Sequence, residues 1–462
     1  MILAVDQGTT GTTCLVVGDD LRPLGRGYRD LQQRFPRPGW VEHDPEQIWR
    51  TVQEAAAEAL ADAGVAAGDL DGIGVTNQRE TTVLWERASG RPVAPAIVWQ
   101  DRRTAERCAE LPAELLRART GLVPDPYFSA TKLEWLLRRH RRPGLAFGTV
   151  DSWLAWKLCG EHVTDRTNAS RTLLYDLDAG GWSDELCALF GVEPELLPRI
   201  AESAEVVGEA ELLGVRLPLA ALAGDQQAAL VGQGCLAPGQ GKATYGTGSF
   251  VLVHAGSERP AAPDGLLVTS AAAPARSFAF EGSILVSGAA VQWLRDGLGL
   301  IASAAESEEL ARSVDSTDGV VFVPALTGLG SPHWDPAARG LVTGITRGTT
   351  RAHLVRAALE AIAFEVADVV DALPEPLHVL RADGGATANA WLMQFQADVL
   401  GCPVEIAAER EATALGAAAL AGMALGRTGA VEPRVGARYE PRREVDRAPW
   451  RDAVARALGS TS

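Results

Sequence analysis

The sequence contains few of the features that mark secreted, zinc-binding or membrane proteins. Its six cysteines are scattered without a C-x-x-C spacing, and its seven histidines form no ligand-like cluster. This usage predicts free thiols in a reducing compartment and no zinc site. The longest stretch of small apolar residues, 412–425, is short and interrupted by glycine, so we expect a buried helix there and no membrane span. No basic segment precedes the strand expected from Ile2, and the predicted location is cytoplasmic.

Positive charge is also scarce. The chain has 43 Lys and Arg residues against 59 Asp and Glu residues, a net charge of −16. No basic stripe offsets this charge, which argues against nucleic acid as a partner. An anionic nucleotide would therefore have to be held locally, by Mg²⁺, backbone N–H groups and helix N-termini.

Common phosphate-binding and hydrolase signatures are missing as well. No segment reads G-x-x-x-x-G-K-[ST], the protein-kinase motifs are absent, and no G-x-S-x-G turn occurs. A nucleotide site must therefore be built differently. The length of 462 residues predicts two or three domains.

Two segments far apart in the chain predict such a site. ILAVDQGTT at residues 2–10 and AGDQQ at residues 223–227 each place an Asp-Gln pair behind a small or apolar run that ends in a turn. A carboxylate at the end of a buried strand can face a metal ion, while N–H groups and hydroxyls of the turn face phosphate. The pair indicates two lobes that close on ATP and a second substrate. Taken alone, each segment is more often a polar turn that caps a strand.

The expected elements divide the chain into an N-terminal lobe, residues 1–230, and a C-terminal lobe, residues 231–462. Each opens with a strand, a Gly/Thr turn and a second strand, at residues 2–17 and 243–253. We expect a hinge of a few residues within 225–236 and a surface tail after Gly426. The other predicted elements are strands at 26–31, 73–76, 82–85, 96–99 and 377–382, and helices beginning with Asp44 and Pro45 and at 132–140, 153–158, 289–298 and 351–373, with a further one ending at Gly401.

Within this framework the chain resembles the FGGY carbohydrate kinases, in particular the branch that phosphorylates glycerol. The resemblance rests on NQRETT at 77–82, VWQDRR at 98–103, DPYFS at 125–129 and YGTGSF at 245–250, and also on GWVEHDP at 39–45, TNASRT at 167–172, PHWDP at 332–336 and LMQFQ at 392–396. It implies an α/β fold of two ribonuclease-H-like (actin-like ATPase) lobes flanking a deep cleft. It also implies ATP and Mg²⁺ as cofactors, glycerol as substrate, and a homodimer or homotetramer. The alternatives are a kinase for another polyol or a ketose such as a pentulose, and an actin-like or chaperone-like ATPase.

The resemblance also implies the site residues. Asp225 would be the general base and Asp6 would bind Mg²⁺, through water. Glycerol would contact Arg79, Glu80, Trp99, Tyr127, Asp225, Gln226 and Phe250. ATP would contact Thr9, Thr10, Gly11, Thr247, Gly288, Gln292, Gly385 and Asn389.

These residue types suit those roles. The fork of Arg79 can donate to two hydroxyl oxygens, Glu80 can accept from hydroxyls, and the aromatic rings can wall the apolar edge of a polyol. A placed carboxylate that accepts the proton of the attacking hydroxyl typically adds about 10²–10⁴ in rate. The alternatives are an exposed Arg79–Glu80 ion pair, aromatic residues in an ordinary core, and Asp225 as the N-cap of a helix.

Three positions depart from patterns in the family. Thr13 stands where many members have an arginine near the γ-phosphate. Arg216 lies in the apolar stretch 212–218, which lacks the Gly-rich loop that binds a sugar bisphosphate in some members, so we expect fructose 1,6-bisphosphate to have no effect. His254 lies on an apolar strand and is no convincing counterpart of the histidine that accepts a phosphoryl group in other members.

Overall fold

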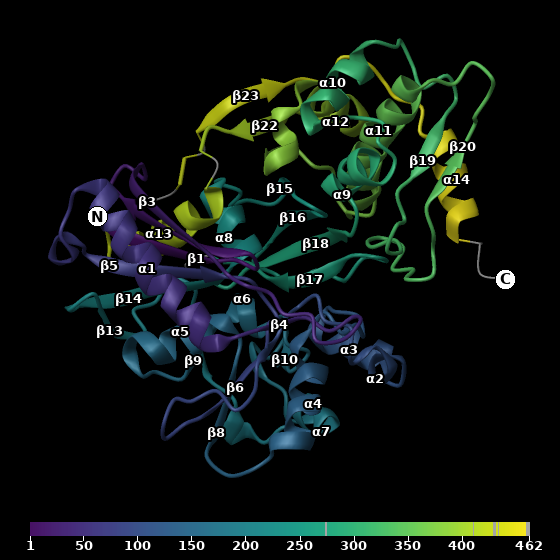
Figure 1. Ribbon diagram of the computed structural model, residues 1–462. Coiled ribbons are helices and arrows are strands. Elements are labelled where there is room, and N and C mark those ends of the chain that lie inside the picture. Colours follow the sequence, from purple (N-terminus) through teal and green to yellow (C-terminus); the bar gives the residue numbers. More distant parts are fainter. Residues whose placement is uncertain (273–274, 410, 428–430, 433, 459–462) are drawn as a thin grey trace.

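The computed structural model describes residues 1–272, 275–409, 411–427, 431–432 and 434–458 (Figure 1). Within these residues, six strands of the first lobe form a sheet in the order β13-β14-β5-β1-β2-β3. β1, β2 and β3 pair antiparallel, whereas β5 runs parallel to both β1 and β14. The strands are β1 (Ile2–Gln7), β2 (Gly11–Val17), β3 (Pro23–Asp30), β5 (Gly72–Asn77), β13 (Gly208–Leu212) and β14 (Val215–Gly224).

The second lobe repeats this arrangement. Its sheet has seven described strands in the order β17-β18-β16-β15-β21-β22-β23. β15, β16 and β18 pair antiparallel, and β21 runs parallel to both β15 and β22. The predicted α/β fold with two similar lobes is therefore confirmed. The strands are β15 (Gln240–Tyr245), β16 (Ser249–Gly256), β17 (Leu267–Ser270), β18 (Phe278–Ile284), β21 (Val379–Asp383), β22 (Val404–Ala407) and β23 (Val435–Tyr439).

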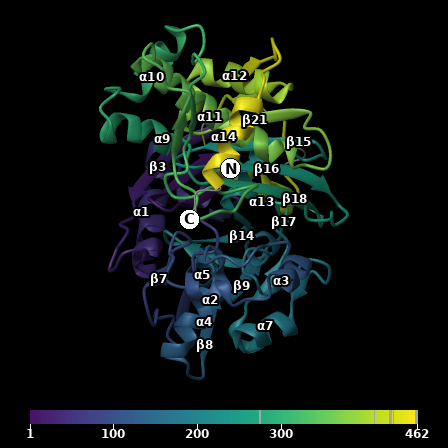
Figure 2. The ribbon, with the colours of Figure 1, turned by 90° about the vertical axis from the view of Figure 1, so that its right-hand side faces the viewer.

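Small sheets and short helices fill the chain between β5 and β14, and they form the lower part of the molecule in Figures 1 and 2. Their packing against Leu133, Phe147 and Leu174 forms a separate core under the first lobe. The two-stranded pairs, including one in the second lobe, are β4 (Glu42–His43) with β7 (Ala96–Ile97), β6 (Val83–Glu86) with β8 (Leu145–Gly148), β9 (Val163–Asp165) with β12 (Arg199–Ala201), β10 (Tyr175–Asp176) with β11 (Gly181–Trp182), and β19 (Val321–Val323) with β20 (Leu341–Thr343).

The helices agree with most of the predicted ones, with shifted ends. Asp44 caps the first helix by accepting a hydrogen bond from Glu46 N (3.0 Å), and Pro45 is its first residue, as predicted. The predicted helix 289–298 is α9 followed by a π-helical turn, Trp293–Gly297. The helices are α1 (Pro45–Ala63), α2 (Ala105–Ala109), α3 (Ala113–Thr120), α4 (Ser129–His140), α5 (Val150–Cys159), α6 (Arg166–Ala169), α7 (Asp184–Phe190), α8 (Asp225–Gly232), α9 (Gly288–Gln292), α10 (Ala304–Arg312), α11 (Arg351–Asp371), α12 (Ala390–Leu400), α13 (Ala412–Ala424) and α14 (Ala448–Leu458).

Most of the segment in which we expected a hinge, residues 225–236, is the helix α8. α8 covers residues 225–232, and it crosses α13 with almost no space between the backbones. A Cβ atom on Gly232 would lie 2.0 Å from the Ala412 carbonyl oxygen, and one on Gly416 would lie 1.8 Å from that of Ala228. Only glycine fits at such a crossing.

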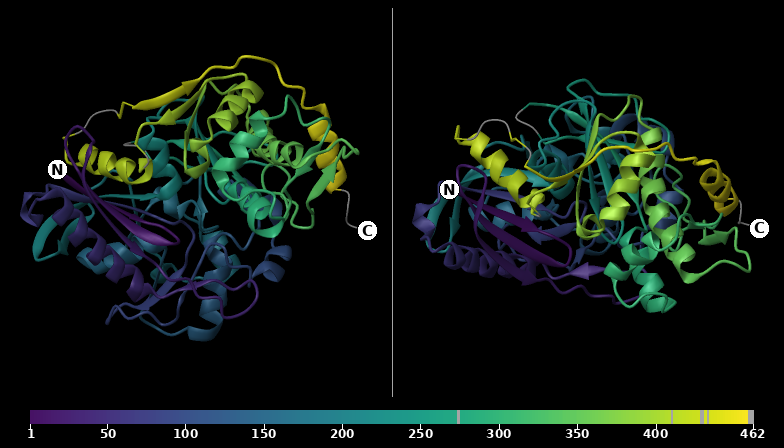
Figure 3. Two further views of the ribbon diagram at one scale, coloured as in Figure 1. Left: turned by 45° about the horizontal axis from the view of Figure 1, so that its top comes forward. Right: turned by 90° about the horizontal axis from the view of Figure 1, so that it is seen from above.

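α13 belongs to the second half of the sequence but packs on the sheet of the first lobe (Figure 3). Its alanines contact Ala4, Leu15 and Ala223, and a Cβ atom on Gly74 of β5 would lie 2.3 Å from the Ala417 carbonyl oxygen. The buried helix expected at residues 412–425 is thus present. None of the described helices is both long and apolar enough to cross a bilayer.

The tail after Gly426, expected as a surface segment, contains a strand and a helix. β23 is an exposed edge strand beside β22, and α14 buries Trp450 against the second lobe. Residues 428–430, 433 and 459–462 of this tail lie outside the described residues. All six cysteines are free thiols in the structure, as predicted.

Candidate active site

The predicted site residues follow strand ends that face each other across the two lobes. Asp6, Arg79 and Asp225 come at or just after the carboxyl ends of β1, β5 and β14, which are neighbours in the first sheet. In the second lobe, Thr247 lies in the turn between β15 and β16, and Gly385 follows β21. Carboxyl ends of adjacent parallel strands are a usual place for ligand sites in α/β proteins.

Arg79 is the centre of a buried charge network. Its Nη1 and Nη2 atoms donate to the two carboxylate oxygens of Glu281 (2.6 and 2.9 Å). Nη2 also donates to the Tyr127 hydroxyl (3.2 Å), and Nη1 to Gln227 Oε1 (3.3 Å). Nε lies 3.2 Å from Asp225 Oδ1. The Arg79 side chain is only 2% exposed, so the alternative of a surface ion pair with Glu80 is wrong.

Glu80 is held in an unusual backbone conformation beside this network. Its φ of 61° lies in the left-handed region, which costs a non-glycine residue about 1–2 kcal/mol. Its carbonyl oxygen accepts from Ser129 Oγ (3.0 Å), and its carboxylate accepts from Arg171 Nε (2.6 Å). Burial raises the pKa of Glu80, against the lowering effect of Arg79 and Arg171. Strain of this kind concentrates at functional sites.

Glu281 of β18 and Arg171 complete the network. Arg171 Nη2 donates to Glu281 Oε1 (3.0 Å), and both side chains are fully buried. Burial opposes ionisation of Glu281, but Arg171 and Arg79 outweigh it and lower its pKa to about 2. The sequence motifs predicted no role for either residue. A charged residue within the apolar strand FAFEGSI was the signal that could have revealed Glu281.

Three predicted aromatic residues meet beside Arg79. The Trp99 ring packs edge-on against the rings of Tyr127 and Phe250, with centroids 5.5 and 6.2 Å apart. Trp99 Nε1 donates to Thr9 Oγ1 (2.9 Å). Phe250 belongs to the second lobe and Trp99 to the first, so the three rings join the lobes. Thr9 connects this aromatic group to the turn after β1.

Asp225 is the first residue of α8, and the preceding Gly224 is the N-cap. The alternative that Asp225 itself is the N-cap is therefore wrong. Its Oδ1 atom accepts from Gln226 N (2.7 Å) and faces Arg79 Nε. Within the described chain, no donor contacts Oδ2, and the side chain is 28% exposed. One carboxylate oxygen thus remains available to a ligand.

Gln226 forms a hydrogen bond with the second lobe. Its Oε1 accepts from the ammonium group of Lys242, which also donates to Thr244 Oγ1 (2.9 Å). Lys242 is fully buried on β15, and burial lowers its pKa to about 8. This buried cation is a residue that the motif reading did not single out.

Asp6 is a fully buried carboxyl group with two other carboxylates acting on it. Burial raises its pKa well above the ordinary value, and the negative charges of Asp225 and Glu411 raise it further. Thr13 lies directly opposite Asp6 in the β1–β2 pair, so no positive charge balances it there. The described residues contain no cluster of three or more metal-ligating side chains. A Mg²⁺ ion here would keep several water or phosphate ligands, which it commonly does.

The predicted nucleotide residues of the second lobe form two groups. Backbone bonds join the β15–β16 turn to the start of α9: Gly288 N donates to Gly246 O (2.9 Å), and Ala289 N to Thr247 O (3.0 Å). Thr247, Gly288 and Gln292 are thereby brought to one place. After β21, Gly384 has a φ of 92°, and a Cβ atom on it would lie 2.4 Å from Tyr245 O. Asn389 caps α12 by accepting from Leu392 N (2.9 Å), so its oxygen is already used.

The remaining predicted residues lie at the turn after β1. Thr10 is exposed there, and Gly11 begins β2, where a Cβ atom would lie 2.4 Å from the Tyr28 hydroxyl.

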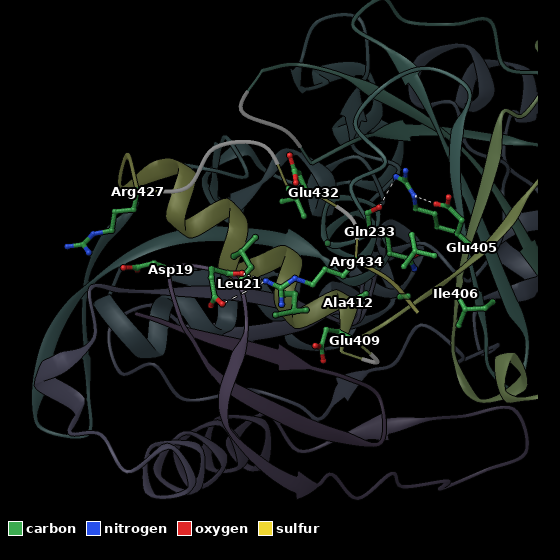
Figure 4. Close-up of a pocket in the computed structure, with 17 residues that line it drawn as sticks. Asp19, Leu21, Gln233, Glu405, Ile406, Glu409, Ala412, Arg427, Glu432 and Arg434 are labelled. Carbon is green, nitrogen blue, oxygen red and sulfur yellow. Dashed lines mark hydrogen bonds and ion pairs between the residues drawn. The ribbon is translucent and has the colours of Figure 1, made fainter. Parts of the chain in front are cut away.

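A cavity of about 440 Å³ lies elsewhere, beside α13 and the end of α8 (Figure 4). Its lining includes Asp19, Gln233, Arg381, Glu405 and Arg434, and none of the predicted site residues. The predicted site residues gather around Arg79 and not around this cavity.

The chain is similar to known proteins over nearly its whole length. Residues 1–232 match the N-terminal domain of the FGGY family of carbohydrate kinases, and residues 241–425 match its C-terminal domain. A glycerol kinase of Aromatoleum aromaticum is 51% identical over 99% of both chains, and one of Trichlorobacter lovleyi is 52% identical over 92% of this chain and 90% of its own.

Solved structures of related proteins are similar to this chain. The glycerol kinase of Plasmodium falciparum with ADP has a TM-score of 0.92 at 33% identity, covering 99% of this chain and 98% of its own. A xylulose kinase of Rhodospirillum rubrum has a TM-score of 0.88 at 28% identity, covering 98% of this chain and 97% of its own.

Proposed function

Because the chain belongs to the FGGY family of carbohydrate kinases, we propose that it transfers the γ-phosphoryl group of ATP to glycerol and forms sn-glycerol 3-phosphate. Relatives named glycerol kinase share about half of its residues over nearly the whole chain. The observation that carries the proposal is the joint position of Arg79, Glu80 and Asp225 at the ends of neighbouring strands, beside Trp99, Tyr127 and Phe250.

The geometry supports a short sequence of events. A glycerol hydroxyl placed between Arg79 Nε and Asp225 replaces their direct contact, donates its proton to the carboxylate and attacks the γ-phosphorus in line. Glu80 and Arg79 orient the other hydroxyls through charge-assisted hydrogen bonds. The rings of Trp99, Tyr127 and Phe250 cover the carbon edge, as expected for a small, thin polyol.

The nucleotide is assigned to the two turns and the loop after β21. Thr9, Thr10, Gly11 and Thr247 face the phosphates, whereas Gly288, Gln292, Gly385 and Asn389 surround the adenosine. Backbone N–H groups of such turns suit phosphate oxygens. The raised pKa of Asp6 fits a Mg²⁺ site, because a divalent cation would relieve its repulsion by Asp225. Bound there through water, Mg²⁺ would neutralise phosphate charge during transfer.

An assay of ADP release over glycerol, dihydroxyacetone, erythritol and xylulose tests the proposal. Glycerol should have the highest kcat/KM. The xylulose kinase of similar fold makes xylulose the informative competitor, and a higher kcat/KM for xylulose than for glycerol would overturn the assignment. The proposal includes a cytoplasmic location, which suits six unpaired thiols, and a homodimer or homotetramer, which light scattering of the purified protein tests.

A further inference from the structure

Glu281 is a buried carboxylate whose two cross-strand neighbours are apolar. It lies in the middle of β18, and its cross-strand partners are Leu252 of β16 and Leu267 of β17. Its side chain is completely buried. Burying a carboxylate is costly unless hydrogen bonds or charged partners compensate it. Here those partners come from the other lobe.

The two arginines that bind Glu281 connect it to two of the three charged residues of the proposed glycerol site, Arg79 and Glu80. Arg79 is one of these residues, and it holds Glu281 with both Nη atoms at 2.6 and 2.9 Å. Arg171 donates one Nη2 hydrogen to Glu281 (3.0 Å) and its Nε hydrogen to Glu80 (2.6 Å). One carboxylate of the second lobe therefore fixes both a donor and, through Arg171, an acceptor of the first lobe.

A count of hydrogen-bond donors shows which contacts of Arg79 a substrate can replace. Arginine has five N–H groups. Here the four on Nη1 and Nη2 donate to Glu281, Tyr127 and Gln227, and Nε makes an ion-pair contact with Asp225. The bonds to Glu281 are the shortest, and those to Tyr127 (3.2 Å) and Gln227 (3.3 Å) and the Nε contact with Asp225 (3.2 Å) are longer. A polyol hydroxyl can replace the acceptors at these longer distances. The Nη1 and Nη2 atoms of Arg79 stay bound to Glu281, and Nε is the atom presented to substrate.

Without Glu281, Arg79 would have two other carboxylates within reach. Asp225 lies 3.2 Å and Glu80 3.8 Å from Nε, so a freed guanidinium would turn toward these two carboxylates. Both would then be occupied by Arg79 rather than by glycerol. The charge of Glu281 thus keeps the Arg79 guanidinium from occupying Asp225 and Glu80, which must bind substrate.

We propose that Glu281 is a positioning residue of the polyol site, which holds the Arg79 fork and, through Arg171, the Glu80 carboxylate from the opposite lobe. This inference rests on the proposed function. It adds that the glycerol site of the first lobe is completed by a side chain of the second.

The test compares Glu281→Gln with Glu281→Asp and with a matched control. Glutamine keeps the shape but loses the charge, and aspartate keeps the charge but is one methylene shorter. The control is Asp398→Asn in α12, because Asp398 is also a buried carboxylate paired with an arginine (Arg443, 3.3 Å) but lies outside the network. Each variant is measured as the full chain for the KM of glycerol, the KM of ATP, kcat, and the rise in Tm that saturating glycerol produces.

Glu281→Gln should raise the glycerol KM at least tenfold and abolish most of the glycerol-induced rise in Tm, while the KM of ATP stays within about twofold. Asp398→Asn should leave both KM values unchanged. Lower thermal stability of Glu281→Gln with an unchanged glycerol KM would overturn the proposal, and so would equal increases in both KM values. If Glu281→Gln does not fold, Glu281→Asp decides: its glycerol KM must rise at least threefold, and an unchanged value overturns the proposal.

A failure of the proposed function is distinguishable from a failure of this inference. If the wild-type chain prefers another polyol, the function is wrong, and the same KM comparison is made with the preferred polyol. If the wild type prefers glycerol and Glu281→Gln binds it normally, only the role of Glu281 is wrong.

Discussion

The Nε atom of Arg79 lies 3.2 Å from Oδ1 of Asp225, so the proposed substrate arginine and the proposed base are in direct contact. This contact gives the base a fixed partner until a hydroxyl replaces it. It also means that the two residues cannot be varied independently, since removing either one leaves the other with a changed charge environment.

Asp225→Asn tests the base. Asparagine keeps the size and the contact with Gln226 N but accepts no proton, so kcat should fall by roughly 10²–10⁴ with a small change in glycerol KM. Asp184→Asn is the matched control, because Asp184 is the first residue of α7, as Asp225 is of α8. Normal turnover of Asp225→Asn in steady-state assays would show that another group takes the proton.

Arg79→Ala tests the polyol contact. The loss of charge-assisted hydrogen bonds, each worth about 1.5–3 kcal/mol, should raise the glycerol KM by roughly ten- to a hundredfold, with little effect on the KM of ATP. Because Glu281 then keeps only Arg171, the free energy of unfolding should also drop by about 3–5 kcal/mol. Arg356→Ala removes another buried, paired arginine, and it should lower stability without raising the glycerol KM. A normal glycerol KM for Arg79→Ala would contradict its substrate role.

Thr13→Arg tests the missing cation near the phosphates. Thr13 lies opposite Asp6 on the neighbouring strand, so an arginine there would reach the same phosphate region. We expect MgATP to bind more tightly by about 1–2 kcal/mol, measured by calorimetric titration. Thr13→Lys serves as the control for charge without a fork. Equal or weaker binding by Thr13→Arg would mean that another cation, of which buried Lys242 is the candidate, already supplies this charge.

Acid stability tests the charge of Glu281. Its pKa is lowered from 4.5 to about 2 in the folded state, so the stabilisation is fully present above pH 4.5 and is lost as pH falls toward 2. The groups that face it are Arg79, Arg171 and Lys242, with Glu80 nearby. Urea unfolding should therefore show Glu281→Gln less stable than wild type at pH 6.5, and the difference should narrow by about 1 kcal/mol at pH 3.5. A difference that stays constant with pH would show that folding does not lower the pKa of Glu281.

Fructose 1,6-bisphosphate should leave activity unchanged at millimolar concentration. The stretch 212–218 is a tight hairpin between β13 and β14, and Arg216 is an exposed side chain 3.9 Å from Glu209. It has no Gly-rich backbone around it to grip a phosphate. Activity and gel filtration with and without the sugar bisphosphate check this. Strong inhibition with a change in oligomer size would refute it.

The sequence could predict the lobes and the residues that carry motifs, because these depend on local patterns. Strand–turn–strand repeats, the Asp44-Pro45 helix start and the strings around Arg79 and Trp99 were all readable in the chain. The roles of Glu281 and Arg171 were not, because a residue 202 positions away from Arg79 becomes its partner only when the two sheets face each other. The same holds for Lys242, whose contact with Gln226 joins β15 to α8.

Two local details were also outside the reach of the sequence. The glycine at position 232, within the segment where we expected a hinge, serves a close helix crossing. Asp225 was considered as an N-cap because aspartate is favoured there, yet the extended φ and ψ of Gly224 place the cap one residue earlier.

The position of α13 has a consequence for how the protein is made. This helix is translated near the end of the chain, but its alanines cover one face of the sheet that begins with Ile2. When the ribosome has released only the first 230 residues, that face has no cover, and the small residues Gly74 and Ala223 remain open to water. The first lobe therefore completes its core only after residue 424 emerges, and until then the nascent chain carries an uncovered apolar sheet face.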